Sequence, residues 1–255
     1  MAELAQALRT WRERRRVSQL ELALRAGTTQ RHVSFVESGR SMPGRSMVIR
    51  LAEALEVPLR ERNALLLNAG FAPVYEETPL SDPKLDAVRT ALERILDGHL
   101  PYPAVITDRH GDLVMANAAF SPLTQGVAPD LLAPPVNLAR LLLHPNGMAR
   151  QILNLDEWAW HIIDAVQREA ERDPSERRAA LVAELEELIP HRQRQPGDDH
   201  IGFAVPLRLS SDEGELHLLT TLTHFGTATN VTLAELRLEA FLPADEATAA
   251  ALRAG

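Results

Sequence analysis

The chain has 255 residues, of which 45% are hydrophobic and 24% are charged, and its formal net charge is −8. This is the composition of a globular protein, and the length allows one large domain or two ordinary ones. The absence of cysteine excludes a disulfide framework, a thiolate metal site and a thiol nucleophile. The opening residues carry charges throughout, and no apolar run approaches the roughly 18 residues of a membrane span. We therefore expect a cytoplasmic protein with no membrane partner.

The charge is unevenly distributed along the chain. Residues 1–62 contain 12 arginines and 7 acidic residues, which gives +5, whereas the remaining 15 basic and 28 acidic residues give −13. A basic head on an acidic body favours contact between the head and a polyanion such as nucleic acid. Solubility alone explains a small basic domain equally well, so charge does not decide between a nucleic-acid-binding role and a role in solubility.

Up to about residue 70 the pattern predicts a compact domain of five short helices. Leu4, Leu8 and Trp11 form one apolar stripe at helical spacing on the first helix. Ser18 is suited to cap the second helix and Gly27 to end it. The third helix begins after Thr28 or Thr29, and two more helices follow it.

The stretch QLELALRAGTTQRHVSFVESGR, residues 19–40, reads as two helices that cross at a steep angle. Ala23 supplies the small residue at the crossing, and Gly27 supplies the unrestricted backbone of the turn. Val33 and Val36 point back into the core, which leaves polar side chains on the outer face of the third helix. Gln and Arg can read base edges in the major groove, and Gln19 can hold a phosphate at a helix start. An ordinary αα-hairpin with a polar face is the alternative.

The joint pattern of small, apolar and acidic residues in this stretch closely resembles the helix-turn-helix of XRE-family, phage-repressor-like transcription regulators. The resemblance covers residues 1–70. It implies base contacts at the start of the third helix, a structural role for Glu37, and a homodimer on a pseudo-palindromic double-stranded operator. Phe35 stands where a polar residue is usual and is suited to contact a thymine methyl group. The candidate DNA-binding residues are Gln19, Thr29, Gln30, Arg31, His32, Ser34, Phe35 and Arg40. Further arginines that could contact phosphate are Arg12, Arg14, Arg15, Arg16 and Arg45.

We expect the first domain to span residues 1–72, a proline-rich linker to span 73–83, and a second domain to span 84–255. The second domain begins with a helix, two strands around a tight turn at RHGD, and a turn into a helix near Ala118. Three helical segments follow between residues 137 and 194. Three antiparallel strands, starting at GFAVPLRLS, and a final helix complete the chain. The pattern predicts an α+β domain with an antiparallel sheet of about five strands.

The second domain shows no convincing catalytic constellation. It contains neither an H-E-x-x-H spacing nor a G-x-S-x-G motif. We therefore expect no enzymatic activity, no metal site and no cofactor.

The segment AVITDRHGDLVMANAAF resembles the opening hairpin of PAS domains, and most of residues 80–253 resembles the ligand-binding domain of MmyB-like regulators. The resemblance implies a homodimeric regulator that holds a fatty-acid-like or other lipophilic ligand in a PAS-like cavity. A carboxylate ligand needs apolar walls and an Arg or His at the mouth. Our polar candidates are His144 and Arg150, and the candidate wall residues are Phe120, Leu142, Trp158, Ile162 and Leu222.

Three hypotheses for function follow. The leading one is a transcription regulator whose PAS-like domain senses a lipophilic small molecule and alters operator binding. The alternative is a constitutive DNA-binding repressor whose second domain is only a dimerisation module. The third, an enzyme fused to a DNA-binding head, needs a convergent polar site that the sequence does not show.

Overall fold

The computed structural model describes residues 2–173, 175–189, 205–211, 214–226 and 228–254. These residues form two compact units. The first unit contains the described residues of 1–78 and of 227–234, and the second contains those of 79–226 and of 235–255. The first unit thus takes in a segment from far beyond residue 84, where the sequence predicts the second domain to begin.

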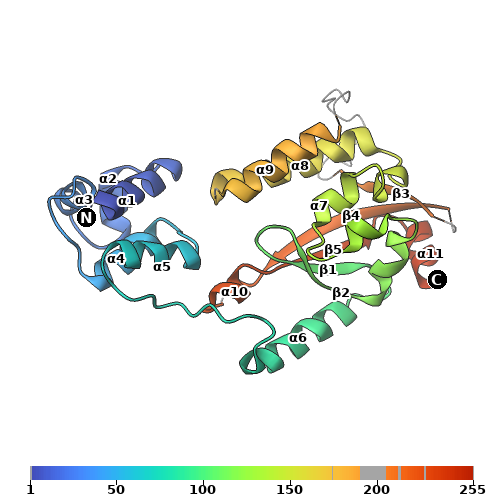
Figure 1. The fold of residues 1–255 in the computed structure, drawn as a ribbon, viewed down its shortest axis with the longest axis horizontal. Coiled ribbons are helices and arrows are strands. Elements are labelled where there is room, and N and C mark those ends of the chain that lie inside the picture. The colour runs from blue at the N-terminus through green and yellow to red at the C-terminus, as the bar shows by residue number, and fades with distance from the viewer. Residues whose placement is uncertain (1, 174, 190–204, 212–213, 227, 255) are drawn as a thin grey trace. The chain divides into compact units, whose positions relative to one another are not determined.

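The first unit is built from five consecutive α-helices (Figure 1), which are α1 (Ala2–Arg14), α2 (Gln19–Arg25), α3 (Gln30–Glu37), α4 (Arg45–Ala54) and α5 (Leu59–Asn68). Helix α1 buries Leu4, Leu8 and Trp11, the stripe that the sequence predicts. Ser18 caps α2, because its hydroxyl accepts a hydrogen bond from the Glu21 amide at 3.1 Å. The predicted all-helical head is confirmed.

The chain after α5 folds back onto that helix. Asn63 of α5 fixes it, since its Nδ2 donates to the Tyr75 carbonyl at 2.7 Å. The short helix α10 (Val231–Ala234) packs on α5 as well. Val231 is fully buried, and its amide donates to the Glu76 carbonyl at 2.7 Å. A segment that lies between two strands in the sequence therefore completes the helical unit.

The second unit is built on a five-stranded antiparallel sheet. Its strands are β1 (Ala104–Thr107), β2 (Leu113–Ala116), β3 (Leu207–Ser211), β4 (Gly214–His224) and β5 (Arg237–Pro243), in the order β2-β1-β5-β4-β3. Gly111 adopts a φ of 78° in the connection of β1 to β2, where the sequence predicts a tight turn. Residues 202–204 of the predicted strand at GFAVPLRLS, and 212–213 of the turn after it, lie outside the described residues. The predicted sheet is confirmed.

Helices cover this sheet and enclose the core of the second unit. Those helices are α6 (Asp86–Asp97), α7 (Leu138–Leu143), α8 (Leu155–Arg172), α9 (Glu176–Glu187) and α11 (Glu246–Ala254). Side chains of α7, α8 and α9 pack with Val105, Leu218 and Phe241 on one face of the sheet, whereas α6 lies on the other side (Figure 1). Short 3₁₀ helices span Pro83–Leu85, Ala118–Thr124, Pro129–Leu132 and Met148–Arg150. Among the described helices, none has the length and apolar character needed to span a bilayer.

Candidate functional site

The start of α3 is an exposed polar surface on a rigid support. Thr29 caps the helix, since its hydroxyl accepts a hydrogen bond from the His32 amide at 3.1 Å. Gln30 and Arg31 are exposed at the first two positions of the helix. Val33 and Val36 are buried, as predicted, and hold the opposite side of α3 in the core. The exposed side chains are therefore fixed in direction by the helix and free to contact a ligand.

Glu37 joins three helices through its carboxylate. Arg12 of α1 donates two hydrogen bonds to it, at 2.6 and 2.9 Å, and Gln19 of α2 donates a third at 2.9 Å. The side chain of Glu37 is only 4% exposed and that of Arg12 is 13% exposed. The bond from Glu37 raises the pKa of Arg12 above its ordinary value, against the opposing effect of burial. Arg12 is therefore a structural cation, and the amide of Gln19 is held in place at the start of α2.

The remaining predicted residues of α3 follow Gln30 along the helix. The guanidinium of Arg31 lies over the ring of Phe35, 5.2 Å from the centroid. Ser34, Phe35 and His32 are half-buried. Arg31 and Phe35 thus form one stacked pair along the helix surface.

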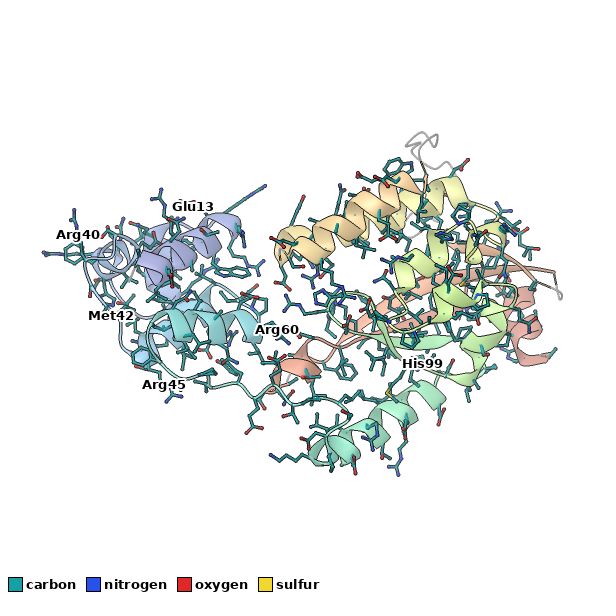
Figure 2. All side chains as sticks on the ribbon, viewed as in Figure 1. Glu13, Arg40, Met42, Arg45, Arg60 and His99 are labelled. Carbon is teal, nitrogen blue, oxygen red and sulfur yellow. The ribbon has the colours of Figure 1, made fainter. Side chains whose placement is uncertain are left out.

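The predicted phosphate-contacting arginines fall into two groups. Arg15 donates to the carbonyls of Leu55 and Glu56 at 3.1 Å each, so it is engaged inside the unit, like Arg12. Four others are exposed and make no ion pair with any residue that the structure describes; they are Arg14, Arg16, Arg40 and Arg45. Figure 2 shows Arg40 and Arg45 on the surface of the first unit. Among the predicted phosphate contacts, these four are therefore available for an anionic partner.

The second unit contains a cavity of about 360 Å³ between its sheet and the helices that cover it. Its apolar wall comes from α7, α8 and α9, and the side chains that form it are Leu138, Leu142, Trp158, Ile162, Val166 and Leu181. The volume lies within the range of about 300–1,000 Å³ that is usual for small-molecule sites. A mostly apolar wall with a few polar groups is also typical of such sites.

The floor of the cavity is the sheet, and it is more polar than the wall. Thr107, Thr220, Leu222, Arg237 and Glu239 line it from three adjacent strands. Burial raises the pKa of Glu239 to about 7, an effect that the nearby Arg237 only partly offsets. The hydroxyl oxygens of Thr107 and Thr220 are buried without a partner among the described residues.

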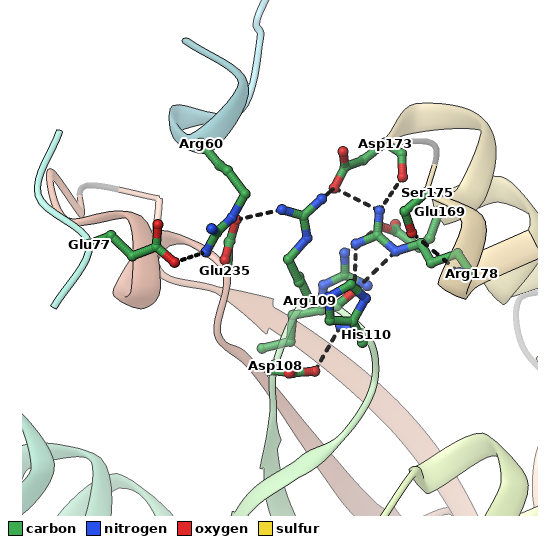
Figure 3. A network of polar contacts seen from close by, with 11 residues as sticks. Arg60, Glu77, Asp108, Arg109, His110, Glu169, Asp173, Ser175, Arg178 and Glu235 are labelled. Carbon is green, nitrogen blue, oxygen red and sulfur yellow. Dashed lines mark hydrogen bonds and ion pairs between the residues drawn. The ribbon is translucent and has the colours of Figure 1, made fainter. Parts of the chain in front are cut away.

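The arginines that line the cavity are of two kinds, and Figure 3 shows two of them, Arg109 and Arg178, beside Asp173. Arg109 and Arg178 are both paired with Asp173, at 2.8 and 2.7 Å, and Arg178 also donates to the Arg109 carbonyl at 3.1 Å. Arg168 and Arg172, by contrast, are exposed and one helical turn apart on α8, and Arg172 is paired only loosely, with Glu169 at 3.6 Å. The first pair holds the opening together, and the second presents positive charge at the mouth.

The structure brings four of the seven predicted ligand-binding residues to this cavity. These are Leu142, Trp158, Ile162 and Leu222. Phe120 lies instead in the core, stacked on Phe241 with ring centroids 6.3 Å apart. His144 and Arg150 are not among the lining residues; His144 Nδ1 accepts from the Asn146 amide, and Arg150 donates to the Asn146 side chain.

Sequence reasoning missed the polar residues of the cavity, among them Thr107, Thr220, Glu239, Arg168 and Arg172. A signal was present in β5, where Leu238 and Ala240 alternate with Arg237 and Glu239. Such alternation is ordinarily read as one buried and one solvated face. In a sheet covered on both faces, it indicates a polar cavity. No group of three His, Asp or Glu side chains suited to a metal ion occurs in the part of the chain that the structure describes.

Comparison with known proteins agrees with the division of the chain into two kinds of unit. Residues 88–254 match the family model of the MmyB-like transcription regulator ligand binding domain, and residues 8–62 match a helix-turn-helix family model. A curated relative is an uncharacterized HTH-type transcriptional regulator, y4dL, of Sinorhizobium fredii. It is 39% identical over 56 residues, which are 22% of this chain and 29% of that protein. The match therefore covers less than a third of the relative's length.

Proposed function

Because this chain belongs to the family of MmyB-like transcription regulators and carries a helix-turn-helix head, we propose that it binds a pseudo-palindromic operator as a homodimer and that a lipophilic anion, such as a fatty acid, alters this binding. The observation that carries the proposal is the apolar cavity with two exposed arginines at its mouth. A dimerisation module without a ligand has no need of such a cavity.

The head supports recognition of double-stranded DNA through α3. Gln30 and Arg31 are exposed at the start of the helix, the position from which a recognition helix reaches base edges in the major groove. Gln pairs with adenine and Arg with guanine through two hydrogen bonds each, and each good pair contributes about 1–3 kcal/mol of discrimination. Arg14, Arg16, Arg40 and Arg45 supply charge for phosphates, which carry affinity and its salt dependence.

The cavity supports an amphiphile with an anionic end. Apolar side chains from three helices form its wall, and Arg168 and Arg172 lie at its mouth. A chain of methylene groups gains about 0.8 kcal/mol per buried CH₂. A carboxylate at the mouth then keeps much of its hydration while it pairs with arginine. A larger hollow of about 900 Å³ beside β3 and α11 has no charged side chain in its described lining, so it fits an anionic amphiphile less well.

The strands of the cavity floor provide a physical connection to the head. Strands β4 and β5 carry Leu222 and Glu239, and the chain between these strands includes α10, which belongs to the first unit. Within that unit, Asn230 Nδ2 donates to Thr78 Oγ1 at 3.0 Å. A ligand that binds one geometry of β4 and β5 better than another therefore acts on a segment of the DNA-binding unit.

The test combines DNA binding with ligand binding on the full chain. An operator is first selected from random double-stranded DNA, and its Kd is then measured at fixed salt with and without dodecanoate. Dodecanoate binding is followed by tryptophan fluorescence, because Trp158 lines the cavity. We expect dodecanoate to bind and to change the operator Kd.

Two variants assign the polar end of the ligand. Replacing Arg168 and Arg172 together by alanine should weaken dodecanoate binding several-fold, because ion pairs between exposed groups contribute about 0.2–1 kcal/mol each. Arg150→Ala removes an exposed arginine outside the cavity lining and should leave the affinity unchanged. If dodecanoate changes neither the fluorescence nor the operator Kd, the constitutive repressor with a dimerisation module replaces our proposal.

A further inference from the structure

Glu239 is an acidic residue of β5, the central strand, and it lies on the face of the sheet that α7, α8 and α9 cover. In the register of the sheet it lies opposite Val105 of β1 and Leu222 of β4, and Phe241 follows it on the same face of β5. All three neighbours are apolar, yet Glu239 makes no hydrogen bond to any residue that the structure describes. Placing an unmatched carboxyl in such surroundings is costly, which marks it as a candidate for function rather than stability.

Two threonines flank this carboxyl from the neighbouring strands. Thr107 of β1 and Thr220 of β4 are its diagonal neighbours on the same face, a relation that places Cα atoms about 7–8 Å apart. Thr107 is only 1% exposed. Both hydroxyl oxygens are buried and lack a partner among the described residues, and both residues line the cavity. Three polar groups from three adjacent strands thus form a diagonal row across the floor, with Glu239 in the middle, and none of them has a hydrogen-bond partner among the described residues.

The nearest cation does not neutralise Glu239. Arg237 lies two positions away on the same face of β5, but its guanidinium is hydrogen-bonded to Glu169 of α8. The raised pKa of Glu239 reflects this isolation. Above the floor, the indole Nε1 of Trp158 is also buried and without a partner among the described residues. Because nearly all buried polar atoms in proteins are hydrogen-bonded to something, the cavity is built to receive polar content as well as an alkyl chain.

We propose that Glu239, Thr107 and Thr220 form a hydrogen-bonding subsite on the cavity floor that selects lipophiles carrying a hydroxyl or amide hydrogen over plain alkyl chains. This inference rests on the proposed function, since it concerns the same cavity, and it narrows the class of ligand. The carboxylate accepts the hydrogen of the ligand, and the hydroxyl of one flanking threonine donates to its oxygen. Arg168 and Arg172 at the mouth are separate from this subsite, so a ligand that uses both is a hydroxylated lipophilic acid.

Selectivity of this kind follows from the cost of leaving the floor unmatched. A plain chain over the subsite leaves these polar groups without partners, whereas a hydroxyl pairs with the carboxylate and with one of the threonines. Sites built to hydrogen-bond a substrate hydroxyl discriminate strongly against analogues that lack it, because their own polar groups are then left unpaired.

The test uses two isomeric probes, 1-octanol and 1-methoxyheptane. They have the same formula and nearly the same apolar surface, but only the alcohol has a hydroxyl hydrogen. Their affinities for the full chain are measured by titration of tryptophan fluorescence, with dodecanoate as a third probe. We expect the wild type to prefer octanol over the ether by about tenfold or more, as is usual for a hydrogen bond to a charged group.

Three substitutions and one control locate the preference. Thr107→Val is nearly isosteric and should reduce it, and Glu239→Leu should abolish it. Thr221→Val is the matched control, because Thr221 lies next to Thr220 on the opposite face of β4 and is exposed. Melting temperatures establish that each variant is folded, and Glu239→Gln, which keeps an acceptor, should retain part of the preference.

The outcomes separate this inference from the function on which it rests. Equal affinity of the wild type for octanol and the ether would overturn the subsite and leave the lipophilic cavity intact. A preference that survives in Glu239→Leu and Thr107→Val would also overturn it. If octanol, the ether and dodecanoate all fail to bind, the proposed function falls and the subsite falls with it.

Discussion

Replacing Glu239 by glutamine should stabilise the protein in a way that depends on pH. The carboxyl has an ordinary pKa of 4.5 and a folded pKa of about 7, because burial disfavours its charged form. The folded state therefore binds a proton more tightly than the unfolded state does. Its stability falls as the pH rises from about 4.5 to about 7 and is constant with respect to this group above that range. Glutamine has the same shape and never ionises.

The magnitude follows from the two pKa values. Each pKa unit corresponds to about 1.36 kcal/mol, so ionising the folded carboxyl costs about 3 kcal/mol more than ionising the unfolded one. The loss of folding stability therefore grows with pH: it is about 1 kcal/mol at pH 5 and reaches the full value of about 3 kcal/mol at pH 8. For a chain of this size, 1 kcal/mol shifts the melting temperature by about 2–4 °C. The advantage of Glu239→Gln should therefore grow by several degrees between pH 5 and pH 8.

Calorimetry of the full chain at the two pH values measures this difference. Comparing variant with wild type at each pH cancels the titration of every other group. A carbon-13 titration of glutamate carboxyls should also show one resonance with a midpoint near 7 that is missing from Glu239→Gln. An advantage that is the same at pH 5 and pH 8 would refute the reasoning, because it would show that the folded carboxyl titrates normally.

Three further predictions concern the head. Glu37→Gln deprives the Arg12 guanidinium of its carboxylate partner and should lower the free energy of unfolding by about 3 kcal/mol or more. The loss should appear as a lower melting temperature of the first unit. An unchanged melting temperature would contradict the anchoring role of Glu37. Gly27→Ala should lower the free energy of unfolding by about 1–2 kcal/mol, because residue 27 has a φ of 61°. Gly44→Ala, at a position where φ is −70°, should lower it far less in the same melting assay. Equal losses of stability in the two variants would contradict this account. Arg40→Ala should reduce the slope of log K against log salt by about 0.9 in operator titrations without changing the melting temperature, and an unchanged slope would show that Arg40 contacts no phosphate.

The fold was largely predictable because its signals are local. The stripe of Leu4, Leu8 and Trp11 and the cap at Ser18 each depend on residues within a few positions, and the structure has both. The pairing of β1 with β2 is likewise set by the tight turn at Gly111 between them. Each of these features is fixed by spacing along the chain, which a single sequence displays directly.

The cavity was less predictable because its residues converge from distant segments. Trp158 and Ile162 stand out as bulky apolar residues on one helix, and the structure places both in the wall. Thr107 and Glu239 are more than 130 positions apart, and only the register of β1 on β5 brings them together. His144 illustrates the converse, since it is close in sequence to the wall residue Leu142 but is not part of the lining. Sequence proximity therefore located the wall but not the polar floor.

The place of α10 has a consequence for how this protein can be taken apart. The chain passes between the two units three times, at residues 78–79, 226–227 and 234–235. A single cut between residues 79 and 83 would leave both fragments attached, because the downstream fragment still carries Val231, buried in the first unit. A gene shortened to its first 78 codons would encode a head whose α5 lacks that cover. The DNA-binding unit is thus not a detachable module, and exchanging it between relatives would require transferring residues 227–234 together with it.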